Sequence, residues 1–396
     1  MRILQCVTTL DPRIGGSVEA GRLLTIGMLR LGQDVEVVSL DSPGDASPGA
    51  AASGTRAEDD WPCTVHRLGP SYGSYLYAPR LLPWLTANAA SYDAIVIHNI
   101  YRYIAYAAWQ ASRKTGIPYY LFTHGMLDPW FKSQPLKWLK KRLFWKLAGR
   151  KMFRDAAAVL YTAEDEKALA HLAFSPYDCN ERVVGLGVAD PPGQEHGGGM
   201  EALGAFRNQV HLPDQAGYLL FLGRVTPKKR VDLLIRAFAA TFPEEATRLV
   251  IAGPDEGGLK RQYSRLPEAA ALGERLIWTG HLDGAPKWAA IAGAEAMALV
   301  SHTENFGISL VEALAMGVPV LTTNKVNIWR EIASGGAGLI DNDDLEGATR
   351  LLARWRRTDG AARQKMRDSA KQVFATSFAI DRVAGKLIAV LSEVAT

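Results

Sequence analysis

The chain has 396 residues, of which 48% are hydrophobic, and its 45 Lys and Arg against 41 Asp and Glu give a formal net charge of +4. A single hydrophobic core stops growing at roughly 250–300 residues, so this length predicts two domains. The small positive excess predicts no nucleic-acid partner, and three widely spaced cysteines argue against a disulfide framework or a zinc site.

The first half alternates short apolar runs with helix-length amphipathic segments. A helix is expected from about residue 17 to 31, and residues 42–60, rich in Gly, Ala, Ser, Pro and Asp, are expected to form a loop. Continuously apolar strands separated by helices predict a parallel sheet covered on both faces. The expected strands are residues 3–7, 35–40, 95–98, 119–122 and 157–161.

A linker is predicted at residues 191–200, where two prolines and four glycines interrupt the pattern. The alternation then restarts, so we expect one Rossmann-like domain over 1–190 and a second over 201–376. A last amphipathic helix, within 377–396, is expected to cross back to the first domain. The expected strands of the second half are residues 218–222, 248–252, 276–279, 296–300 and 318–322.

The loop after the expected strand 218–222 carries Gly223, Arg224 and Lys229. Ligands of open α/β sheets bind outside the carboxyl ends of the strands. The Arg224 guanidinium can pair with phosphate in a bidentate manner, and Lys229 adds a second cation at the start of a helix. The loop therefore indicates a diphosphate site, with a solvated basic turn as the alternative.

A second motif begins at Glu304, continues through Asn305, Phe306 and Gly307, and ends at Glu312. If a helix begins near Phe306, its free amides suit an anion, and both glutamates can face one ligand. An acidic first turn alone would explain Glu304, but Glu312 lies in an apolar run and needs a partner.

These motifs, followed by Ala-Leu-Ala-Met-Gly-Val-Pro-Val at 313–320 and by the glycine stretch 336–339, resemble the signature of retaining family-four (group 1) glycosyltransferases. The resemblance covers most of 218–345 closely and the first half more loosely. It implies an α/β protein of the GT-B fold, with two Rossmann-like doubly wound domains facing each other across a cleft that holds a nucleoside-diphosphate sugar.

The resemblance also implies residue roles. Arg224 and Lys229 bind the donor diphosphate, Glu304 contacts the donor sugar, and Glu312 holds the ribose. The implied catalytic residues are His124, Glu304, Arg224 and Lys229. The implied donor-binding residues are Gly15, Gly16, Arg224, Lys229, His281, Leu282, Glu304, Asn305, Phe306, Gly307, Ile308 and Glu312.

In the first half, His124 follows an expected strand and precedes a glycine, at the functional edge of the sheet. The resembled family places a sugar-contacting histidine there; a capping or core histidine is the alternative. His98 follows another strand and is a weaker candidate. Gly15 and Gly16 allow close approach to an anion, and their spacing differs from a dinucleotide-binding G-x-G-x-x-G motif.

Residues 132–154 are dense in Lys and Arg, with leucines at 136, 139, 143 and 147 on one helical face. Such a segment can lie on anionic lipid, which would suit a lipid-linked acceptor. The alternative is that the leucines pack on the domain. No run approaches the roughly 20 apolar residues of a membrane span. We expect a cytoplasmic protein, with the inner face of the membrane as a candidate location.

Asp341-Asn342-Asp343 has the form of a metal-binding motif, but we expect a turn before a helix that begins near Leu345. Two phosphate-binding cations make a metal unnecessary, so we expect neither a metal nor a cofactor.

The predicted function is retaining transfer of a hexose from a UDP- or GDP-linked donor to a hydroxyl of a glycan or lipid-linked saccharide, in the biosynthesis of cell-surface polysaccharide. A sugar-nucleotide epimerase, a phosphorylase and a non-catalytic nucleotide-sugar sensor remain alternatives. The sequence predicts no oligomeric state.

Overall fold

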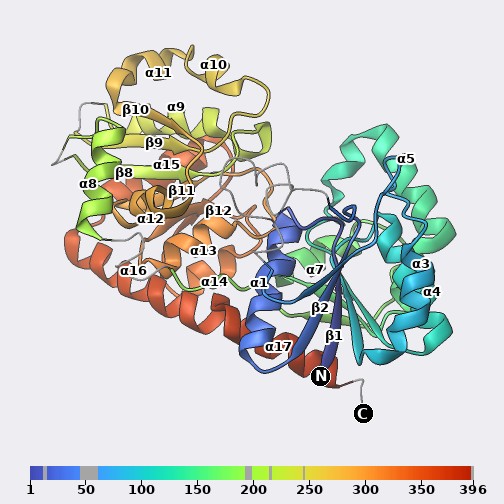
Figure 1. Ribbon diagram of the computed structural model, residues 1–396. Coiled ribbons are helices and arrows are strands. Elements are labelled where there is room, and N and C mark those ends of the chain that lie inside the picture. Colours follow the sequence, from blue (N-terminus) through green and yellow to red (C-terminus); the bar gives the residue numbers. More distant parts are fainter. Residues whose placement is uncertain (12–15, 45–60, 192–198, 214–215, 244–245, 394–396) are drawn as a thin grey trace. The chain divides into compact units, whose positions relative to one another are not determined.

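A computed structural model of the chain describes residues 1–11, 16–44, 61–191, 199–213, 216–243 and 246–393. The chain divides into two compact units: unit 1 comprises 1–187 and 379–396, and unit 2 comprises 188–378. Each unit is a parallel sheet flanked by helices (Figure 1). Most of the predicted linker, together with Gly15 and most of the predicted loop 42–60, lies outside the described residues.

Unit 1 contains a seven-stranded sheet in the order β3-β2-β1-β4-β5-β6-β7. All pairs are parallel, and Ile3 lies between Val35 and Ala94 in register. Five of the strands were predicted; β3 and β7 were missed because they are short, polar and only half-buried at the two edges. The strands are β1 (Arg2–Cys6), β2 (Asp34–Ser39), β3 (Thr64–Arg67), β4 (Ala94–Ile97), β5 (Tyr119–Phe122), β6 (Ala158–Tyr161) and β7 (Glu181–Val183).

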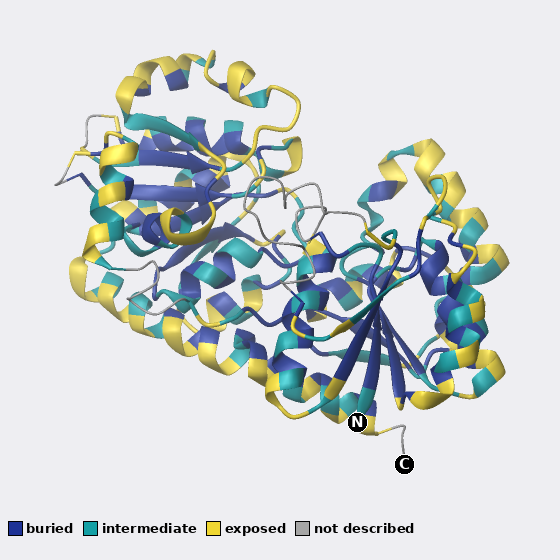
Figure 2. Ribbon diagram, viewed as in Figure 1, coloured by how far each residue is buried: buried dark blue, intermediate teal, exposed yellow. Residues whose placement is uncertain are grey.

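Successive residues of these strands point to opposite faces of the sheet, and each face has its own core. Leu4 belongs to the core under the helices α3 and α4, whereas Ile3 belongs to the core under α1 and α17. Figure 2 shows the strands as the buried layer. The helices are α1 (Gly16–Arg30), α3 (Leu81–Asn88), α4 (Tyr103–Thr115), α5 (Pro135–Phe144), α6 (Arg150–Arg154), α7 (Glu164–His171) and α17 (Ile380–Ser392).

Unit 2 contains a six-stranded parallel sheet in the order β10-β9-β8-β11-β12-β13. The strand β13, which the sequence patterns did not predict, is half-buried at one edge. The strands are β8 (Tyr218–Leu222), β9 (Arg248–Ala252), β10 (Leu276–Gly280), β11 (Ala296–Leu299), β12 (Val320–Thr323) and β13 (Gly338–Asp341). The helices are α8 (Met200–Gln209), α9 (Val231–Thr241), α10 (Leu259–Tyr263), α11 (Pro267–Leu272), α12 (Gly284–Ala292), α13 (Ile308–Ala315), α14 (Trp329–Ser334), α15 (Leu345–Arg357) and α16 (Gly360–Val373).

Both sheets have the doubly wound strand order, in which the chain reverses its direction of travel across the sheet between the first and fourth strands. The reversal lies between β1 and β4 in unit 1 and between β8 and β11 in unit 2. Loops that follow these neighbouring strands run to opposite sides, which leaves a crevice at the carboxyl edge. Each unit therefore offers one natural ligand position.

The pairing of α1 with α17 in unit 1 depends on a glycine (Figure 1). A Cβ at Gly27 would lie 2.8 Å from the Cβ of Ala384 and 3.1 Å from the carbonyl oxygen of Ile380. A Cβ at Gly385, in the partner helix, would meet only Leu31 at 3.8 Å, an ordinary contact. The two glycines therefore form a matched pair.

We predict that Gly27→Ala lowers the free energy of unfolding by about 1–2 kcal/mol, because overpacking outweighs the gain in helix propensity. Gly385→Ala gains helix propensity without a clash, so it should raise the free energy of unfolding by up to about 1 kcal/mol. Urea denaturation of both variants checks this. Equal effects of the two substitutions would show that close packing against α17 does not require glycine at position 27.

Candidate functional site

The loop after β8 is held by the loop after β9. The backbone amide of Gly223 donates to the carbonyl of Ala252 at 2.9 Å, and that of Val225 donates to Pro254 at 2.8 Å, so the ladder continues past the strand ends. A Cβ at Gly253, whose φ is +144°, would lie 1.9 Å from the carbonyl oxygen of Gly223. Only glycine permits this approach, which fixes the backbone that carries Arg224.

Arg224 points to solvent, with 61% of its side chain exposed, and pairs with Glu256 at 2.8 Å. Such an exposed pair contributes little stability. An incoming phosphate, with more charge than one carboxylate, can replace Glu256 as the partner of the guanidinium. Arg224 thus lies where the sequence placed it, at the carboxyl edge of the unit 2 sheet.

Lys229 is half-buried and forms a direct hydrogen-bonded ion pair with Glu304. Its ammonium group also lies beside Gly223, about 4.0 Å from where a Cβ would be. Lys229 follows β8 and Glu304 follows β11, so the pair spans the point where the chain reverses. The structure brings these two predicted residues together.

The helix α13 begins at Ile308, two residues after the expected start, because Gly307 takes a left-handed conformation with φ +79° at the N-cap. The amides of Phe306, Gly307 and Ile308 stand at the positive end of its dipole. Glu312, in the second turn, pairs with Lys287 of α12 at 2.8 Å. Lys287 is the partner that the sequence required for Glu312.

The remaining predicted donor-binding residues of unit 2 lie in several environments. Phe306 is buried and meets Phe378 edge to face, and Asn305 accepts a hydrogen bond from Asn327 at 3.3 Å. After β10, His281 is exposed, with its ring 3.7 Å from Asp283, whereas Leu282 is buried. Phe306 and Leu282 therefore offer a ligand mainly their backbone.

The Asp341-x-Asp343 pair is engaged in protein contacts. Asp341 ends β13 and pairs with Arg350 at 2.7 Å, and Asp343 pairs with His302. Asp344 caps α15, which begins at Leu345 as predicted. Within the described ranges, no group of three His, Cys, Asp or Glu side chains is placed to hold a metal ion.

In unit 1, a chain of hydrogen bonds joins three polar side chains across the reversal point. His98, which follows β4, is buried; its Nε2 lies 2.5 Å from Oε1 of Gln5 in β1, and its Nδ1 lies 3.0 Å from Nε2 of His124. The Gln5 amide nitrogen faces the carbonyl oxygen of Gly21 and the hydroxyl of Thr25. The predicted residue His124 is thus the outer end of a buried chain.

The carbonyl of Gly21 determines which atom donates in each of these hydrogen bonds. The carbonyl of Gly21 can only accept, so the Gln5 amide nitrogen faces it and Oε1 accepts from Nε2 of His98. Burial lowers the pKa of His98 to about 3, so its Nδ1 is an acceptor at neutral pH. Burial first, and then the neighbouring His98, also hold the pKa of His124 well below its ordinary value.

It follows that Nε2 of His124 donates to His98, and that Nδ1 of His124 carries a lone pair. A neutral imidazole in this tautomer accepts a hydrogen bond from a ligand hydroxyl and cannot act as an acid. Sequence reasoning had found His124 and His98 but missed Gln5. A single glutamine inside an apolar strand is the signal that pointed to it.

A second residue that the sequence did not reveal fixes the turn at His124, whose φ is +45°. The buried carboxylate of Glu166 accepts hydrogen bonds from the hydroxyl of Thr123 and the amide of Gly125, and from the amide and hydroxyl of Thr162. Four donors on one carboxylate hold the loops after β5 and β6 together. Gly16, the other candidate in unit 1, is the first residue of α1.

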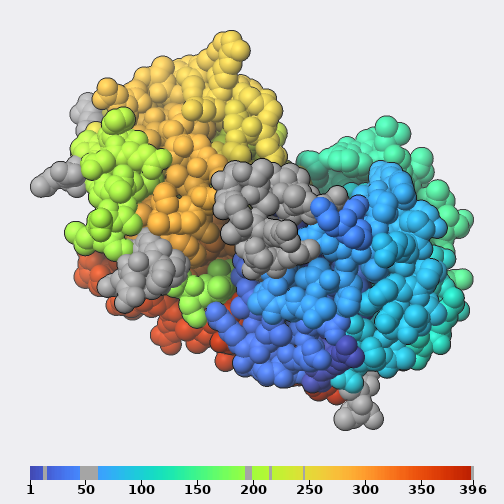
Figure 3. All heavy atoms as spheres, in the orientation of Figure 1, coloured from blue at the N-terminus to red at the C-terminus, as the bar shows by residue number. Residues whose placement is uncertain are grey.

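The leucines of the basic segment 132–154 do not pack on the domain, so that alternative is wrong. Figure 3 shows the segment on the surface of unit 1. Its aromatic residues turn inward instead, and Trp145 stacks on Phe174 at 4.7 Å between ring centroids. The exposed fractions of Leu136, Leu139, Leu143 and Leu147 are 78%, 63%, 56% and 67%. Among the described residues, no helix is long and apolar enough to cross a bilayer.

Two doubly wound parallel sheets, with cations and a helix N-terminus at the carboxyl edge of one and a histidine at that of the other, define a two-domain protein of the GT-B fold. Residues 204–373 match the family model of glycosyl transferases group 1, and residues 15–187 match that of a glycosyl transferase 4-like domain. The chain belongs to the group 1 glycosyltransferases.

Curated relatives include D-inositol 3-phosphate glycosyltransferases. That of Streptosporangium roseum is 32% identical over 163 residues, 38% of this chain and 37% of the relative. That of Thermobispora bispora is 29% identical over 271 residues, 63% of this chain and 59% of the relative. The chain thus spans less than two thirds of the length of these relatives.

Solved structures similar to this chain share its fold at low identity. HepE of Anabaena in complex with UDP and glucose has a TM-score of 0.73 at 17% identity, with 100% of both chains covered. The sucrose-phosphate synthase of Thermosynechococcus elongatus has a TM-score of 0.73 at 18% identity, with 99% of both chains covered. These similarities show the GT-B fold.

We predict that acidification destabilises unit 1 through His98. An unfolded histidine has a pKa near 6.5, whereas folded His98 stays neutral to about pH 3. Stability is therefore present above pH 6.5 and is lost as the pH falls, by about 1.4 kcal/mol per pH unit. From pH 6.5 to 5 the loss from His98 is about 2 kcal/mol.

Urea denaturation at pH 6.5 and 5 measures this loss, and His98→Gln, which removes the titrating group, should show a correspondingly smaller one. Long-range ¹⁵N–¹H NMR should show neutral Nε2–H tautomers for His98 and His124 at pH 5, with exposed His281 as the reference in the same spectrum. An imidazolium at position 98 at that pH would contradict the chain of hydrogen bonds.

Proposed function

We propose that the protein is a retaining, metal-independent glycosyltransferase that moves a hexose from a UDP- or GDP-linked donor to a hydroxyl of a glycan or lipid-linked saccharide for the cell surface. The observation that carries the proposal is the Lys229–Glu304 pair beside Arg224 at the reversal point of the unit 2 sheet. A diphosphate brings two to three negative charges to these two cations.

In this proposal the carboxylates hold the cations until the donor arrives. The diphosphate replaces Glu256 at Arg224 and shares Lys229, which leaves Glu304 able to accept a hydrogen bond from a sugar hydroxyl. The amides at the start of α13 add further donors for the anion. Glu312 holds the ribose hydroxyls while Lys287 balances its charge.

The reaction breaks the bond between the anomeric carbon and the diphosphate oxygen and forms one between that carbon and the acceptor oxygen. Arg224 and Lys229 stabilise the departing diphosphate, whose oxygen takes the acceptor's proton. His124 Nδ1 accepts a hydrogen bond from a hydroxyl of the transferred sugar. Attack on the face that the diphosphate leaves retains the configuration.

We also propose that the basic segment 132–154 rests on an anionic membrane surface. This segment contains nine Lys and Arg and no Asp or Glu. Its four exposed leucines lie at helical spacing, and cations beside such a face suit anionic lipid headgroups. This contact favours a cytoplasmic location at the inner face of the membrane.

The first test follows labelled UDP- and GDP-sugars incubated with the protein, with and without a membrane extract as the source of acceptor. We expect label in product only with the extract, and Arg224→Ala and Lys229→Ala each to lower the rate about 100- to 1,000-fold. Exposed Lys228, in the same turn, is the matched control, and Lys228→Ala should stay within about threefold.

An isomerised donor without extract would indicate an epimerase, and saturable binding without turnover would indicate a sensor. Normal rates in either the Arg224 or the Lys229 variant would overturn the phosphate site.

The second test addresses the ribose. We expect the protein to bind UDP about tenfold or more tightly than 2′-deoxy-UDP, because a hydrogen bond to a carboxylate contributes roughly 1.5–3 kcal/mol. Glu312→Gln should remove most of this ratio, whereas Glu346→Gln, which alters an exposed carboxylate of α15, should keep it. Calorimetry measures both affinities. If the ratio of the two affinities is unchanged in the Glu312 variant, Glu312 does not bind the ribose and only pairs with Lys287.

A further inference from the structure

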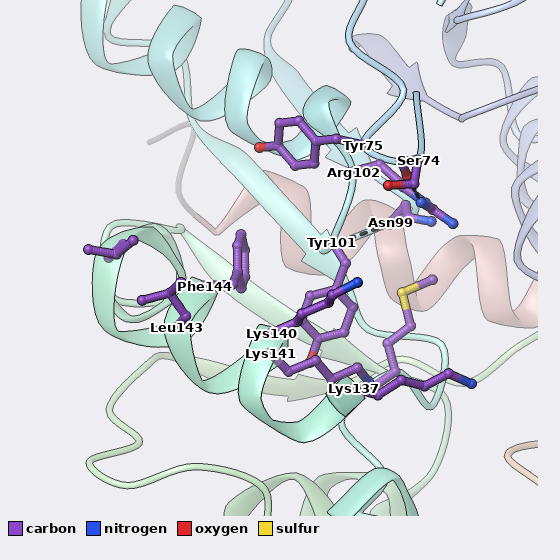
Figure 4. Close-up of a pocket in the computed structure, with 12 residues that line it drawn as sticks. Ser74, Tyr75, Asn99, Tyr101, Arg102, Lys137, Lys140, Lys141, Leu143 and Phe144 are labelled. Atoms are coloured by element: carbon purple, nitrogen blue, oxygen red, sulfur yellow. Dashed lines mark hydrogen bonds between the residues drawn. The ribbon is translucent and has the colours of Figure 1, made fainter. Parts of the chain in front are cut away.

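Unit 1 contains a cavity of about 670 Å³ that the donor site does not use. It lies between the turn at Ser74 and Tyr75, the loops after β4 and β5, and the helical run that begins with α5. The lining residues beyond that turn are Asn99, Tyr101, Arg102, Met126, Lys137, Lys140, Lys141, Leu143, Phe144 and Leu147. Figure 4 shows lysines of α5 on one side and the Ser74–Tyr75 turn with Arg102 on the other. The volume is that of a site for a small organic ligand.

The charged residues that line the cavity are Arg102, Lys137, Lys140 and Lys141, and no described lining residue is a carboxylate. Lys141 is committed to the fold: it donates to the carbonyl of Met126 at 2.9 Å and lies 4.3 Å from the ring centroid of Tyr101. Lys137 and Lys140 form no ion pair with any described carboxylate. This wall favours an anion.

The other end of the cavity is apolar. Leu143, Phe144 and Leu147 line it, and the first and last of these are more than half exposed. Leu136 and Leu139 continue the same face of the helix outside the cavity. Exposed leucines beside unpaired lysines match a ligand with an anionic group on an aliphatic chain.

The cavity also adjoins the histidine chain. Asn99 follows His98 directly, and Met126 lies two residues after His124. A molecule in the cavity is therefore bound at the same sheet edge as the group that we assign to the transferred sugar.

We infer that this cavity is the acceptor site and that the acceptor is a lipid-linked saccharide with a phosphate on its lipid. The phosphate meets Lys137, Lys140 and Arg102, the aliphatic chain leaves along Leu143 and Leu147, and a hydroxyl of the saccharide receives the transferred sugar. The inference rests on the proposed function and narrows its acceptor to a phosphate-bearing lipid. Arg102 is steadied for this role by its hydrogen bond to the carbonyl of Ser74.

The test uses decyl phosphate below its micelle concentration, with decyl glucoside and inorganic phosphate as the probes that keep one half of the ligand each. Calorimetry should show saturable binding of decyl phosphate, at least about tenfold tighter than either comparison probe. Binding of the glucoside or of inorganic phosphate as tight as that of decyl phosphate overturns the inference.

Paired variants locate the binding. Lys137→Glu/Lys140→Glu should weaken decyl phosphate at least about tenfold. Lys146→Glu/Lys151→Glu makes the same change in net charge on the same segment, at exposed residues outside the cavity, and should stay within about threefold. Equal loss in both pairs would mean diffuse attraction and would overturn the site.

The leucines form a second pair of variants. Leu143→Ser/Leu147→Ser alters the cavity, whereas Leu136→Ser/Leu139→Ser alters the same helix face outside it. Only the first should weaken decyl phosphate, although both should weaken binding to vesicles of phosphatidylcholine and phosphatidic acid. Equal weakening of decyl phosphate in the two would place the chain on the open face and overturn the cavity.

Thermal shift with UDP and GDP in the same proteins separates the two proposals. Stabilisation by a nucleotide without decyl phosphate binding overturns the acceptor site alone. Binding of decyl phosphate without stabilisation by UDP or GDP overturns the donor site and therefore the proposed function.

Discussion

The order of the strands is the constraint on which both candidate sites depend. A parallel sheet buried on both faces accepts few polar side chains within its strands, and the reversal between the first and fourth strands opens one crevice at its carboxyl edge. In unit 2, Lys229 and Glu304 follow the two strands that flank the reversal. In unit 1, Gln5 lies within β1 and His98 follows β4, the two strands that flank the reversal there. The same topology has thus been given a charged pair in one unit and a neutral chain in the other.

The chain of hydrogen bonds through Gln5, His98 and His124 decides what His124 can do chemically, because it begins at a group that can only accept a hydrogen bond. The carbonyl of Gly21 can only accept a hydrogen bond, and this fixes which atom donates in each successive hydrogen bond from Gln5 to His98 and His124. His124 therefore presents a lone pair at Nδ1 and keeps its proton at Nε2, in the hydrogen bond to His98. A group of this kind can orient a sugar hydroxyl but cannot protonate a leaving group. Its lowered pKa also makes His124 a poor base. In the mechanism that we propose, the acceptor's proton therefore goes to the diphosphate, whose charge Arg224 and Lys229 stabilise.

The sequence predicted the strands that are continuously apolar and the residues whose motif is local. The predicted bounds of β5, β8 and β9 are those observed, whereas β3, β7 and β13 carry polar or half-buried residues and give no periodic signal. Arg224 and Lys229 could be predicted because they follow a glycine directly after an apolar strand. His98 was a candidate from sequence, but its contact with Gln5 joins residues 93 positions apart, and Glu166 is one of three consecutive acids that begin α7, so only the folded chain shows the contact and singles out Glu166.

The two sets of cations differ in what holds them before a ligand binds. Arg224 and Lys229 are each paired with a carboxylate, so in our proposal an anion of higher charge displaces the partner and the site selects a diphosphate over a monoanion. Lys137 and Lys140 face no described carboxylate and attract any anion, so their selectivity has to come from elsewhere. The leucines along the same helix supply it, because an aliphatic chain adds binding energy that a soluble anion lacks. In the two proposals, charge therefore selects the donor and apolar contact selects the acceptor.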